Sequence, residues 1–573
     1  MNALRLTAML DEMATLLELD GANSFKVTAY QKAVRALSSF EGNLVDALAE
    51  KRLTQIEGIG KGIAEKIEEA YRTEAIAELD ELRKRIPRGL VEMTSIQGFG
   101  PKKALAVYTQ LGIDTMAKLE AACRDGSLAG LKGFGDKTAE KILQGIAQLA
   151  KFSGRRRLDV ALKAAAPLRA ALASHAAVLR VESAGSLRRR RETVGDLDFV
   201  AATDSPEAVM DFFVNLESVE SVLGKGGTKA SVLLDSGIQA DLRCVTPAQF
   251  PFALAHFTGS KEHNTRMRQR AKDRGLKLNE YGLFPEGSES SLAASDETDI
   301  YRHLGLPFIR PELREDLGEF VAAEENRLPE AVERRHLRGL MHMHTEYSDG
   351  KPTLEQYAEW ATQHGFAWLG IADHSQSLTV ANGLNEKRVL KQHEEIDAVN
   401  ARHPGVRLLK GIESDILTDG RLDYPDSFLG NFEWIVASVH THFNLPEAEQ
   451  TRRVLQAIEN PHTTIIGHLT GRLLLAREGF AIDQKAIIRA AAQAGVAIEI
   501  NANPMRLDLD WRLVHYAVEQ GCRLCISPDA HIINGLMDYE FGIWMALKGW
   551  AEPRHLLNCL SADEFLAFAR SRR

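Results

Sequence analysis

The sequence predicts a multidomain protein with an all-α N-terminal region, an α+β middle region and an α/β barrel at the C-terminal end. At 573 residues the chain is too long for one domain, because single hydrophobic cores stop growing at roughly 250–300 residues. Three patterns distinguish the regions. They are a two-glycine turn that recurs between helical segments, two aspartates that open an apolar strand, and a series of His, Asp and Glu residues that follow apolar runs.

The N-terminal region, residues 1–150, has apolar residues at helical spacing and breaks at glycine. One turn occurs three times. Its pattern is an apolar residue, any residue, Gly, an apolar residue and a second Gly, and a helix that carries a lysine follows. Glycines let backbone amides approach a ligand closely, and amides that open a helix suit phosphate. The turn resembles the helix-hairpin-helix module that binds the DNA backbone. A single copy could equally be a plain turn between helices, but three copies favour non-specific DNA binding. The glycines expected at the DNA are Gly58, Gly60, Gly98, Gly100, Gly133 and Gly135.

The middle region contains Asp196 and Asp198 at the start of an apolar run. Alternate side chains of a strand share a face, so both carboxylates should lie together while the leucine between them enters the core. Adjacent carboxylates repel unless a cation lies between them, and oxygen ligands favour Mg²⁺ or Mn²⁺. A lone Asp-x-Asp is more often a surface turn. Here Asp241 on a later strand offers a third carboxylate, and the Gly185-Ser186 turn offers amides for phosphate, which together predict two-metal phosphoryl transfer.

These residues resemble the nucleotidyltransferase palm of the family X DNA polymerases, which are related to DNA polymerase beta. A second block, from Phe257 to Tyr281, resembles the thumb entry of that family, where a Phe-Thr-Gly-Ser turn meets the incoming nucleotide. The resemblance implies that Asp196 and Asp198 bind both metals. It implies that Asp241 binds the metal that activates the primer 3′-hydroxyl.

Further contacts follow from the same resemblance. His256 stands where animal relatives carry Tyr, which predicts measurable ribonucleotide insertion. Arg268 would meet the template in the minor groove. The residues implied at the nucleotide are Gly185, Ser186, Arg189, Phe257, Gly259 and Asn264.

One lysine of the N-terminal region resembles a catalytic group. The segment from Gly60 to Lys66 is similar to the polymerase beta segment that forms a Schiff base with a cleaved abasic sugar, and Lys66 has the nucleophile's position. Lys26 and Tyr30 match neighbouring positions of that pocket, while the segment's other lysine falls on Gly62. A solvated lysine on a helix would give the same pattern.

The C-terminal region carries metal-ligand residue types after successive apolar runs. Ligands at the C-terminal ends of parallel strands converge on one barrel mouth, and mixed His, Asp and Glu ligands suit Zn²⁺, Mn²⁺ or Fe²⁺. The blocks resemble the polymerase-and-histidinol-phosphatase (PHP) domain, a distorted TIM-like barrel whose site holds three divalent metals. The residues that fill its nine ligand positions are His342, His344, Asp349, His374, Glu413, His440, His468, Asp529 and His531.

Composition adds limits on environment and boundaries. The net charge of −9 alone argues against a nucleic-acid binder, although local arginine runs could follow a phosphate backbone. Five scattered cysteines, no signal peptide and no long apolar run predict a cytoplasmic, nucleoid-associated monomer that avoids membranes. The expected segments are a lyase-like, DNA-binding helical domain (1–82), a fingers-like helical domain with two further hairpin turns (83–152), a palm (153–250), a thumb (251–312), a Glu-rich linker (313–335) and a PHP domain (336–573).

Together the resemblances imply a DNA-directed DNA polymerase that fills short gaps in DNA repair, including base excision repair. Its partners would be gapped or primer-template DNA and dNTPs, with Mg²⁺ or Mn²⁺ in the palm. The PHP domain would be a metal-dependent 3′–5′ exonuclease or phosphoesterase. Two alternatives remain: a nucleotidyltransferase for RNA or a small molecule, and a PHP phosphatase for which the N-terminal half is a tether.

Overall fold

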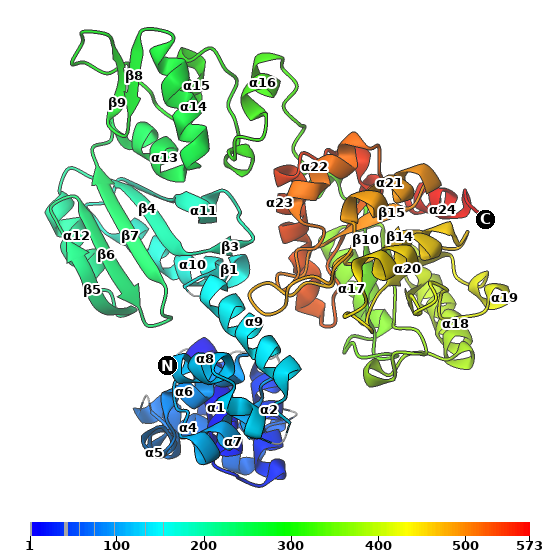
Figure 1. Cartoon of the computed structure of the whole chain (residues 1–573). Coiled ribbons are helices and arrows are strands. Elements are labelled where there is room, and N and C mark those ends of the chain that lie inside the picture. Colours follow the sequence, from blue (N-terminus) through cyan, green and yellow to red (C-terminus); the bar gives the residue numbers. More distant parts are fainter. Residues whose placement is uncertain are drawn as a thin grey trace. The chain divides into compact units, whose positions relative to one another are not determined.

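The computed structural model describes residues 3–38, 44–56, 58–73, 75–96, 98–131, 133–152 and 154–573 (Figure 1). The chain forms two compact units, Met1–Ser153 and Gly154–Arg573. None of the helices in the described ranges is long and apolar enough to cross a membrane.

The first unit is helical throughout its described residues, as the glycine-broken pattern predicts. Gly58, Gly98 and Gly133 have φ of +92°, +76° and +91°, a left-handed conformation that glycine adopts without strain. The second glycine of each pair directly precedes α4, α7 or α9, so each predicted turn opens a helix. The elements are α1 (Ala3–Leu19), α2 (Ser24–Ser38), α3 (Leu44–Ala49), η1 (Leu53–Gln55), α4 (Lys61–Thr73), α5 (Ala77–Arg85), α6 (Arg88–Thr94), α7 (Pro101–Leu111), α8 (Met116–Arg124), η2 (Ser127–Gly130) and α9 (Asp136–Phe152).

The second unit begins with the palm, a five-stranded sheet in the order β2-β4-β7-β6-β5. Strand β4 pairs antiparallel with β2 and parallel with β7, and α10 and α12 pack on the sheet. Two short strands, β1 and β3, form a separate pair. The palm elements are β1 (Arg156–Arg157), α10 (Leu158–Ser174), β2 (Arg180–Ser183), α11 (Gly185–Arg188), β3 (Thr193–Val194), β4 (Asp196–Ala202), α12 (Pro206–Val214), β5 (Val219–Lys225), β6 (Lys229–Leu234) and β7 (Gln239–Val245).

The thumb follows, with a separate core that includes Met267, Leu283 and Tyr301. Its elements are α13 (Phe250–Thr258), α14 (Lys261–Lys272), β8 (Leu276–Asn279), β9 (Gly282–Pro285), α15 (Glu297–His303), η3 (Pro311–Leu313) and α16 (Glu319–Glu324).

The segment expected to be a linker, residues 313–335, differs from that expectation, because it contains α16 and contributes Phe320 to the thumb core. Glu319 is fully buried. It accepts hydrogen bonds from the backbone amides of Asp316 (3.0 Å) and Leu317 (2.8 Å) and lies 2.8 Å from Nδ1 of His263. The glutamate-rich composition therefore did not reveal that the Glu319 carboxylate is buried and that protein groups supply its hydrogen bonds.

The C-terminal part is a nearly closed barrel of seven parallel strands in sequential order, β10 to β16. A parallel bridge between Met343 and Ala530 brings the first and last strands together. The strands are β10 (Gly339–Met343), β11 (Trp368–Ile371), β12 (Arg407–Asp415), β13 (Trp434–Ser438), β14 (Ile465–Ile466), β15 (Ala497–Asn501) and β16 (Leu524–Ser527). The helices of this part are η4 (Arg334–His336), α17 (Leu354–His364), η5 (Thr379–Ala381), α18 (Glu386–Arg402), α19 (Asp426–Leu429), α20 (Glu447–Glu459), α21 (Gln484–Ala494), α22 (Trp511–Glu519), η6 (Ile533–Asp538), α23 (Tyr539–Lys548), η7 (Pro553–His555), η8 (Leu557–Cys559) and α24 (Ala562–Arg570).

Candidate active sites

The palm brings the three predicted aspartates together. Asp198 on β4 and Asp241 on β7 are direct partners across the parallel pair, and Asp196 lies two residues before Asp198 on the same face. Their carboxylate oxygens lie within 4.8 Å of one another, while Leu197 between them is fully buried. Burial, together with Asp196 and Asp241, raises the pKa of Asp198 to about 7. The cluster therefore concentrates negative charge that a divalent cation would relieve.

The Gly185-Ser186 turn lies directly beside this cluster. A Cβ atom on Gly185 would lie 2.0 Å from Oδ2 of Asp198, and its φ is +57°, so both space and backbone conformation require glycine. The turn opens the short helix α11, which Arg189 follows. The guanidinium of Arg189 donates to the backbone oxygen of Thr258 (2.5 Å), so the palm turn is tied to the thumb.

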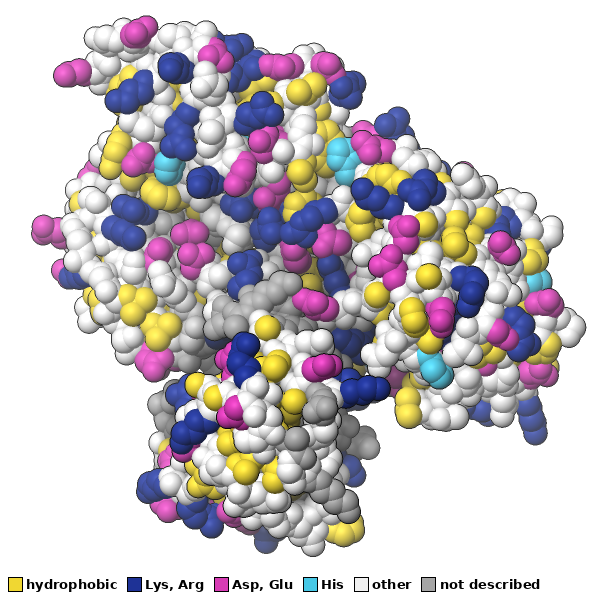
Figure 2. Space-filling model, in the orientation of Figure 1, with side chains coloured by type: hydrophobic (Ala, Val, Ile, Leu, Met, Phe, Trp, Pro, Cys, Tyr) yellow, Lys and Arg dark blue, Asp and Glu magenta, His cyan; other side chains and the backbone are white. Residues whose placement is uncertain are grey.

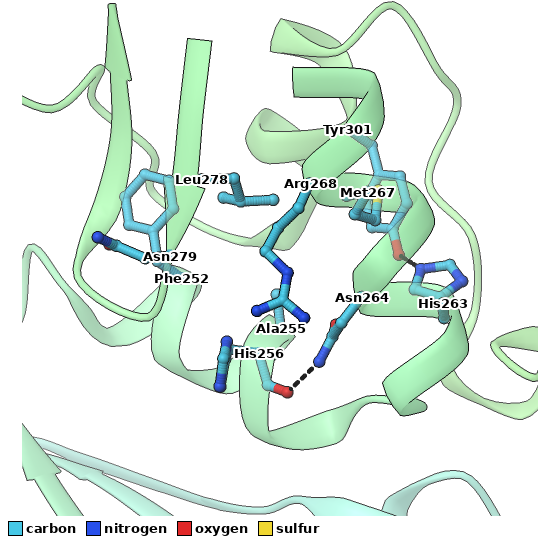
Figure 3. A pocket seen from close by; sticks show the side chains of 10 residues that line it. All are labelled: Phe252, Ala255, His256, His263, Asn264, Met267, Arg268, Leu278, Asn279 and Tyr301. Atoms are coloured by element: carbon cyan, nitrogen blue, oxygen red, sulfur yellow. Dashed lines mark hydrogen bonds between the residues drawn. The ribbon is translucent and has the colours of Figure 1, made fainter. Parts of the chain in front are cut away.

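Two of the predicted thumb contacts, Asn264 for the nucleotide and Arg268 for the template, line one pocket together with His256, as Figure 3 shows. Asn264 on α14 donates a hydrogen bond of 2.7 Å to the backbone oxygen of His256 at the end of α13. Arg268, one turn further along α14, is exposed and extends into the same space (Figure 3). Phe257 faces the palm, where the guanidinium of Arg243 lies 5.1 Å from its ring centre. Gly259, with a φ of +70°, lies in the turn between the two helices.

The nine predicted ligands of the C-terminal part converge at the C-terminal ends of the barrel strands. They form four overlapping groups, and the possible ligand atoms of each group lie within 4.8 Å of one another. Gly350 allows this approach, because a Cβ atom there would lie 2.1 Å from the backbone oxygen of His344. The groups are His344, Asp349, His374 and His531; His342, Glu413 and His468; His342, His344 and Asp529; and His374, Glu413 and His440.

Glu413 is the centre of this cluster. Its Oε1 lies 3.0 Å from Nε2 of His468 and 3.2 Å from Nε2 of both His342 and His440, and its Oε2 lies 2.8 Å from Nδ1 of His374. Buried polar atoms without a hydrogen-bond partner gather here, among them Nε2 of His342, both ring nitrogens of His344 and Oε2 of Glu413. Buried polar atoms are ordinarily paired, so this set of imidazole and carboxylate donors fits bound metal ions.

The charges in the cluster are strongly coupled. Burial, with His531 and His374, lowers the pKa of His344 to about 3, so its ring is neutral and able to act as a ligand. Burial alone would raise the pKa of the Asp349 carboxyl, but His531, His344 and His374 outweigh burial and lower it to about 2. Strongly shifted pKa values within one cluster of charged groups are typical of a functional site.

Two further carboxylates at the cluster were not predicted from the sequence. Glu499 on β15 is fully buried and lies 2.5 Å from Nδ1 of His342, and it also accepts the backbone amide of His468 at 2.6 Å. Asp415 at the end of β12 pairs with Nδ1 of His440. Partners of this kind fix the orientation of metal-binding imidazoles. The alternation of apolar and polar residues over Ala497–Asn501 was the signal that could have revealed Glu499.

Lys66 of the first unit lies in a small charged cluster. Its ammonium is 3.1 Å from Glu69 and 3.5 Å from Glu78, and its side chain is 25% exposed. Partial burial lowers the pKa of Lys66, but the two carboxylates outweigh burial and raise it. Tyr30 shares these neighbours, and burial with Glu78 and Glu69 raises its pKa to about 12. Lys26 also pairs with Glu78, at 2.6 Å.

On the face of the molecule drawn in Figure 2, Lys and Arg side chains lie among acidic ones. The net charge of −9 agrees with this mixture. Contact with a phosphate backbone would therefore depend on local groups such as the hairpin amides.

Comparison with known proteins places these features in a family. Family models match the helix-hairpin-helix domain over residues 1–76, the SAM-like helix-hairpin-helix tandem over 90–148, the DNA polymerase beta thumb over 253–315 and the PHP domain over 341–503. The DNA polymerase/3′-5′ exonuclease PolX of Bacillus subtilis (strain 168) is 40% identical over 564 residues, which cover 98% of each chain. The chain belongs to the family X DNA polymerases that carry a PHP domain. This confirms the predicted resemblance and fold class.

More distant relatives match parts of this family X chain. DNA polymerase lambda of Rattus norvegicus is 25% identical over 343 residues, 54% of this chain and 56% of the relative. A probable phosphatase of Vibrio atlanticus is 29% identical over 205 residues, 33% of this chain and 76% of the relative. The solved ternary primer-template complex of Leishmania infantum polymerase beta has 23% identity and a TM-score of 0.27, covering 40% of this chain and 100% of that one.

Proposed function

We propose that this family X chain is a DNA-directed DNA polymerase that fills short gaps in DNA repair and that its PHP domain is a 3′–5′ exonuclease. The observation that carries the polymerase assignment is the direct pairing of Asp198 with Asp241, beside the Gly185 turn and Arg189. The 98% coverage by a relative named as a polymerase and exonuclease supports both activities.

In the palm, we assign Asp196, Asp198 and Asp241 to two Mg²⁺ or Mn²⁺ ions. Bound metal would neutralise the triphosphate and favour ionisation of the primer 3′-hydroxyl. The chain's own groups then orient the substrate. The amides of Gly185 and Ser186 and the guanidinium of Arg189 would hold phosphate oxygens.

In the thumb, Phe257, Gly259 and Asn264 would position the sugar and base, and Arg268 would contact the template strand. Asn264 already donates one hydrogen bond to the His256 oxygen, which leaves its second N–H and its Oδ1 for the base. Burial lowers the pKa of His256, so a neutral imidazole lies at this pocket at neutral pH.

In the PHP domain, we assign the nine clustered residues to three divalent metals among Zn²⁺, Mn²⁺ and Fe²⁺. Glu413 would be a ligand for this metal set, since both of its oxygens face imidazoles. Glu499 and Asp415 would hold His342 and His440 in place. The six hairpin glycines would bind the DNA backbone through amides, which makes that binding independent of base sequence.

We also propose that Lys66 is the nucleophile of a lyase for 5′-deoxyribose-phosphate ends. Its ion pairs with Glu69 and Glu78 keep the amine protonated, so the proposal requires that substrate binding displace those carboxylates. The neighbourhood of Lys26 and Tyr30 supports the comparison with the polymerase beta pocket.

A single labelled substrate tests the two main activities. A 3′-recessed primer is incubated with and without dNTPs, in Mg²⁺ and then in Mn²⁺. We expect extension with dNTPs and 3′ shortening without them. Asp241→Asn should abolish extension, on the order of a thousandfold or more, and leave shortening intact. His344→Ala should do the reverse. If folded His344→Ala protein shortens primers as fast as the parent, the exonuclease does not belong to the PHP domain.

A further inference from the structure

A lysine of the PHP domain is buried against polymerase residues. Lys548, the last residue of α23, is 1% exposed, and its ammonium donates three hydrogen bonds. The acceptors are the backbone oxygen of Arg189 (3.0 Å), the backbone oxygen of Glu312 (3.1 Å) and Oε1 of Glu315 (2.6 Å). Arg189 lies in the palm, and Glu312 and Glu315 lie in the thumb segment that runs from η3 to α16, so all three hydrogen bonds of this PHP side chain go to the polymerase part.

Glu315 connects Lys548 to the guanidinium of Arg189. Its Oε1, which accepts from Lys548, also accepts from Nε of Arg189 at 3.1 Å, and its Oε2 accepts from Arg191 at 3.2 Å. The side chains of Glu315 and Arg189 are only 8% and 13% exposed. One buried carboxylate is thus shared by three cations, which limits how much of the charge of Arg189 it neutralises.

Arg189 reaches the reacting centre from this network. Its Nη1 donates to Thr258 and would lie 3.0 Å from a Cβ atom on Gly259, in the turn assigned to the nucleotide. The position of its guanidinium therefore affects the nucleotide turn.

We infer that Lys548 is a positioning residue for polymerisation, through which the PHP domain holds Arg189 in place for the triphosphate of the incoming dNTP. The inference rests on the polymerase function proposed above. Lys548 fixes the main chain of Arg189 by donating to its carbonyl oxygen. It also competes with the Arg189 guanidinium for the Glu315 carboxylate. Without the ammonium, Glu315 would pair more completely with Arg189 and draw it away from phosphate.

A second contact between the same domains provides a matched control. Glu192 accepts from Trp511 (2.8 Å) and from Arg512 (3.0 Å) of α22, and no hydrogen bond described for that pair reaches Arg189 or Glu315. Arg512→Gln weakens this domain contact and leaves the three hydrogen bonds of Lys548 in place. It also leaves Trp511, whose ring centre lies 4.4 Å from the Lys548 ammonium, and the ion-pair link of Arg512 to Glu315 runs only through the 3.5 Å ion pair between Glu192 and Arg191. Lys548→Met removes the ammonium at nearly constant shape. Lys548→Gln retains a donor for the carbonyls and serves if Lys548→Met fails to fold.

The experiment measures steady-state extension of a primer-template with dNTP varied at saturating DNA, then with DNA varied. For Lys548→Met we expect the KM for dNTP to rise on the order of tenfold, which corresponds to the loss of one charge-assisted hydrogen bond to the nucleotide. We expect kcat, the KM for DNA and the 3′–5′ shortening rate to stay within about twofold. Arg512→Gln should leave the KM for dNTP unchanged.

An unchanged KM for dNTP in folded Lys548→Met and Lys548→Gln would overturn the inference. An equal rise in Arg512→Gln would also overturn it, because general domain docking would then be the cause. If the parent protein itself extends no primer, the proposed polymerase function fails and this inference fails with it.

Discussion

Asp198→Asn should stabilise the metal-free palm even though it destroys a proposed catalytic group. The pKa of Asp198 is raised from 3.8 to about 7, chiefly by burial and by Asp196 and Asp241. A carboxyl with a raised pKa favours the folded state while protonated, and that contribution is lost as pH rises from about 4 to 7. Three pKa units at about 1.4 kcal/mol each correspond to a loss of up to about 4 kcal/mol. Asparagine stays neutral at every pH, so the variant does not undergo this loss of stability.

Hydrogen exchange of peptides from β4 and β7, in protein stripped with EDTA, measures this locally. The free energy of opening should be higher in Asp198→Asn than in the parent. Between pH 5 and pH 8 this difference should grow by about 3 kcal/mol, after correction for intrinsic exchange. Added Mg²⁺ should restore protection in the parent only. Asp204→Asn, at an exposed aspartate just beyond β4, is the control and should show no such trend. Weaker protection in Asp198→Asn than in the parent at pH 8 would refute the reasoning.

Three further predictions concern other sites. Glu499→Gln removes the charge that holds His342 and should slow 3′–5′ shortening by about 10–100-fold in single-turnover assays while primer extension stays intact; equal rates would show that Glu499 has no orienting role. The His256 pocket predicts measurable ribonucleotide insertion, strongest with Mn²⁺, and discrimination as strict as that of a selective DNA polymerase would contradict it. Borohydride should trap the parent on a 5′-deoxyribose-phosphate end much more than Lys66→Ala, and an undiminished adduct would remove Lys66 from the lyase proposal.

The parts of the sites that follow from strand geometry could be predicted from the sequence. Alternation on one strand places Asp196 and Asp198 on one face, and the adjacent strand adds Asp241. The nine predicted PHP ligands, which the resemblance to that family supplied, follow apolar runs, so their meeting at the barrel mouth was expected from the rule that parallel strands end together. Each of these inferences depends on local pattern and on one fold-level rule.

The parts of the fold and the sites that the sequence did not reveal depend on contacts between distant segments. Lys548 and Glu315 are 233 residues apart, and neither lies in a pattern that indicates a partner. Glu319 made its segment look like a solvated linker, because composition does not reveal that backbone amides and His263 satisfy the carboxylate. Glu499 is one polar residue in a buried strand, and only the three-dimensional structure shows that it faces His342.

The sharing of ligands in the PHP cluster has a thermodynamic consequence. Glu413 and the imidazoles of His342, His344 and His374 each belong to two of the four possible ligand groups. Binding at one position fixes side chains that the next position also needs, so part of the ordering entropy is lost only once. Occupancy should therefore be cooperative: a chelator titration should give a steep transition between the empty and the fully loaded cluster, with little of the partly loaded forms.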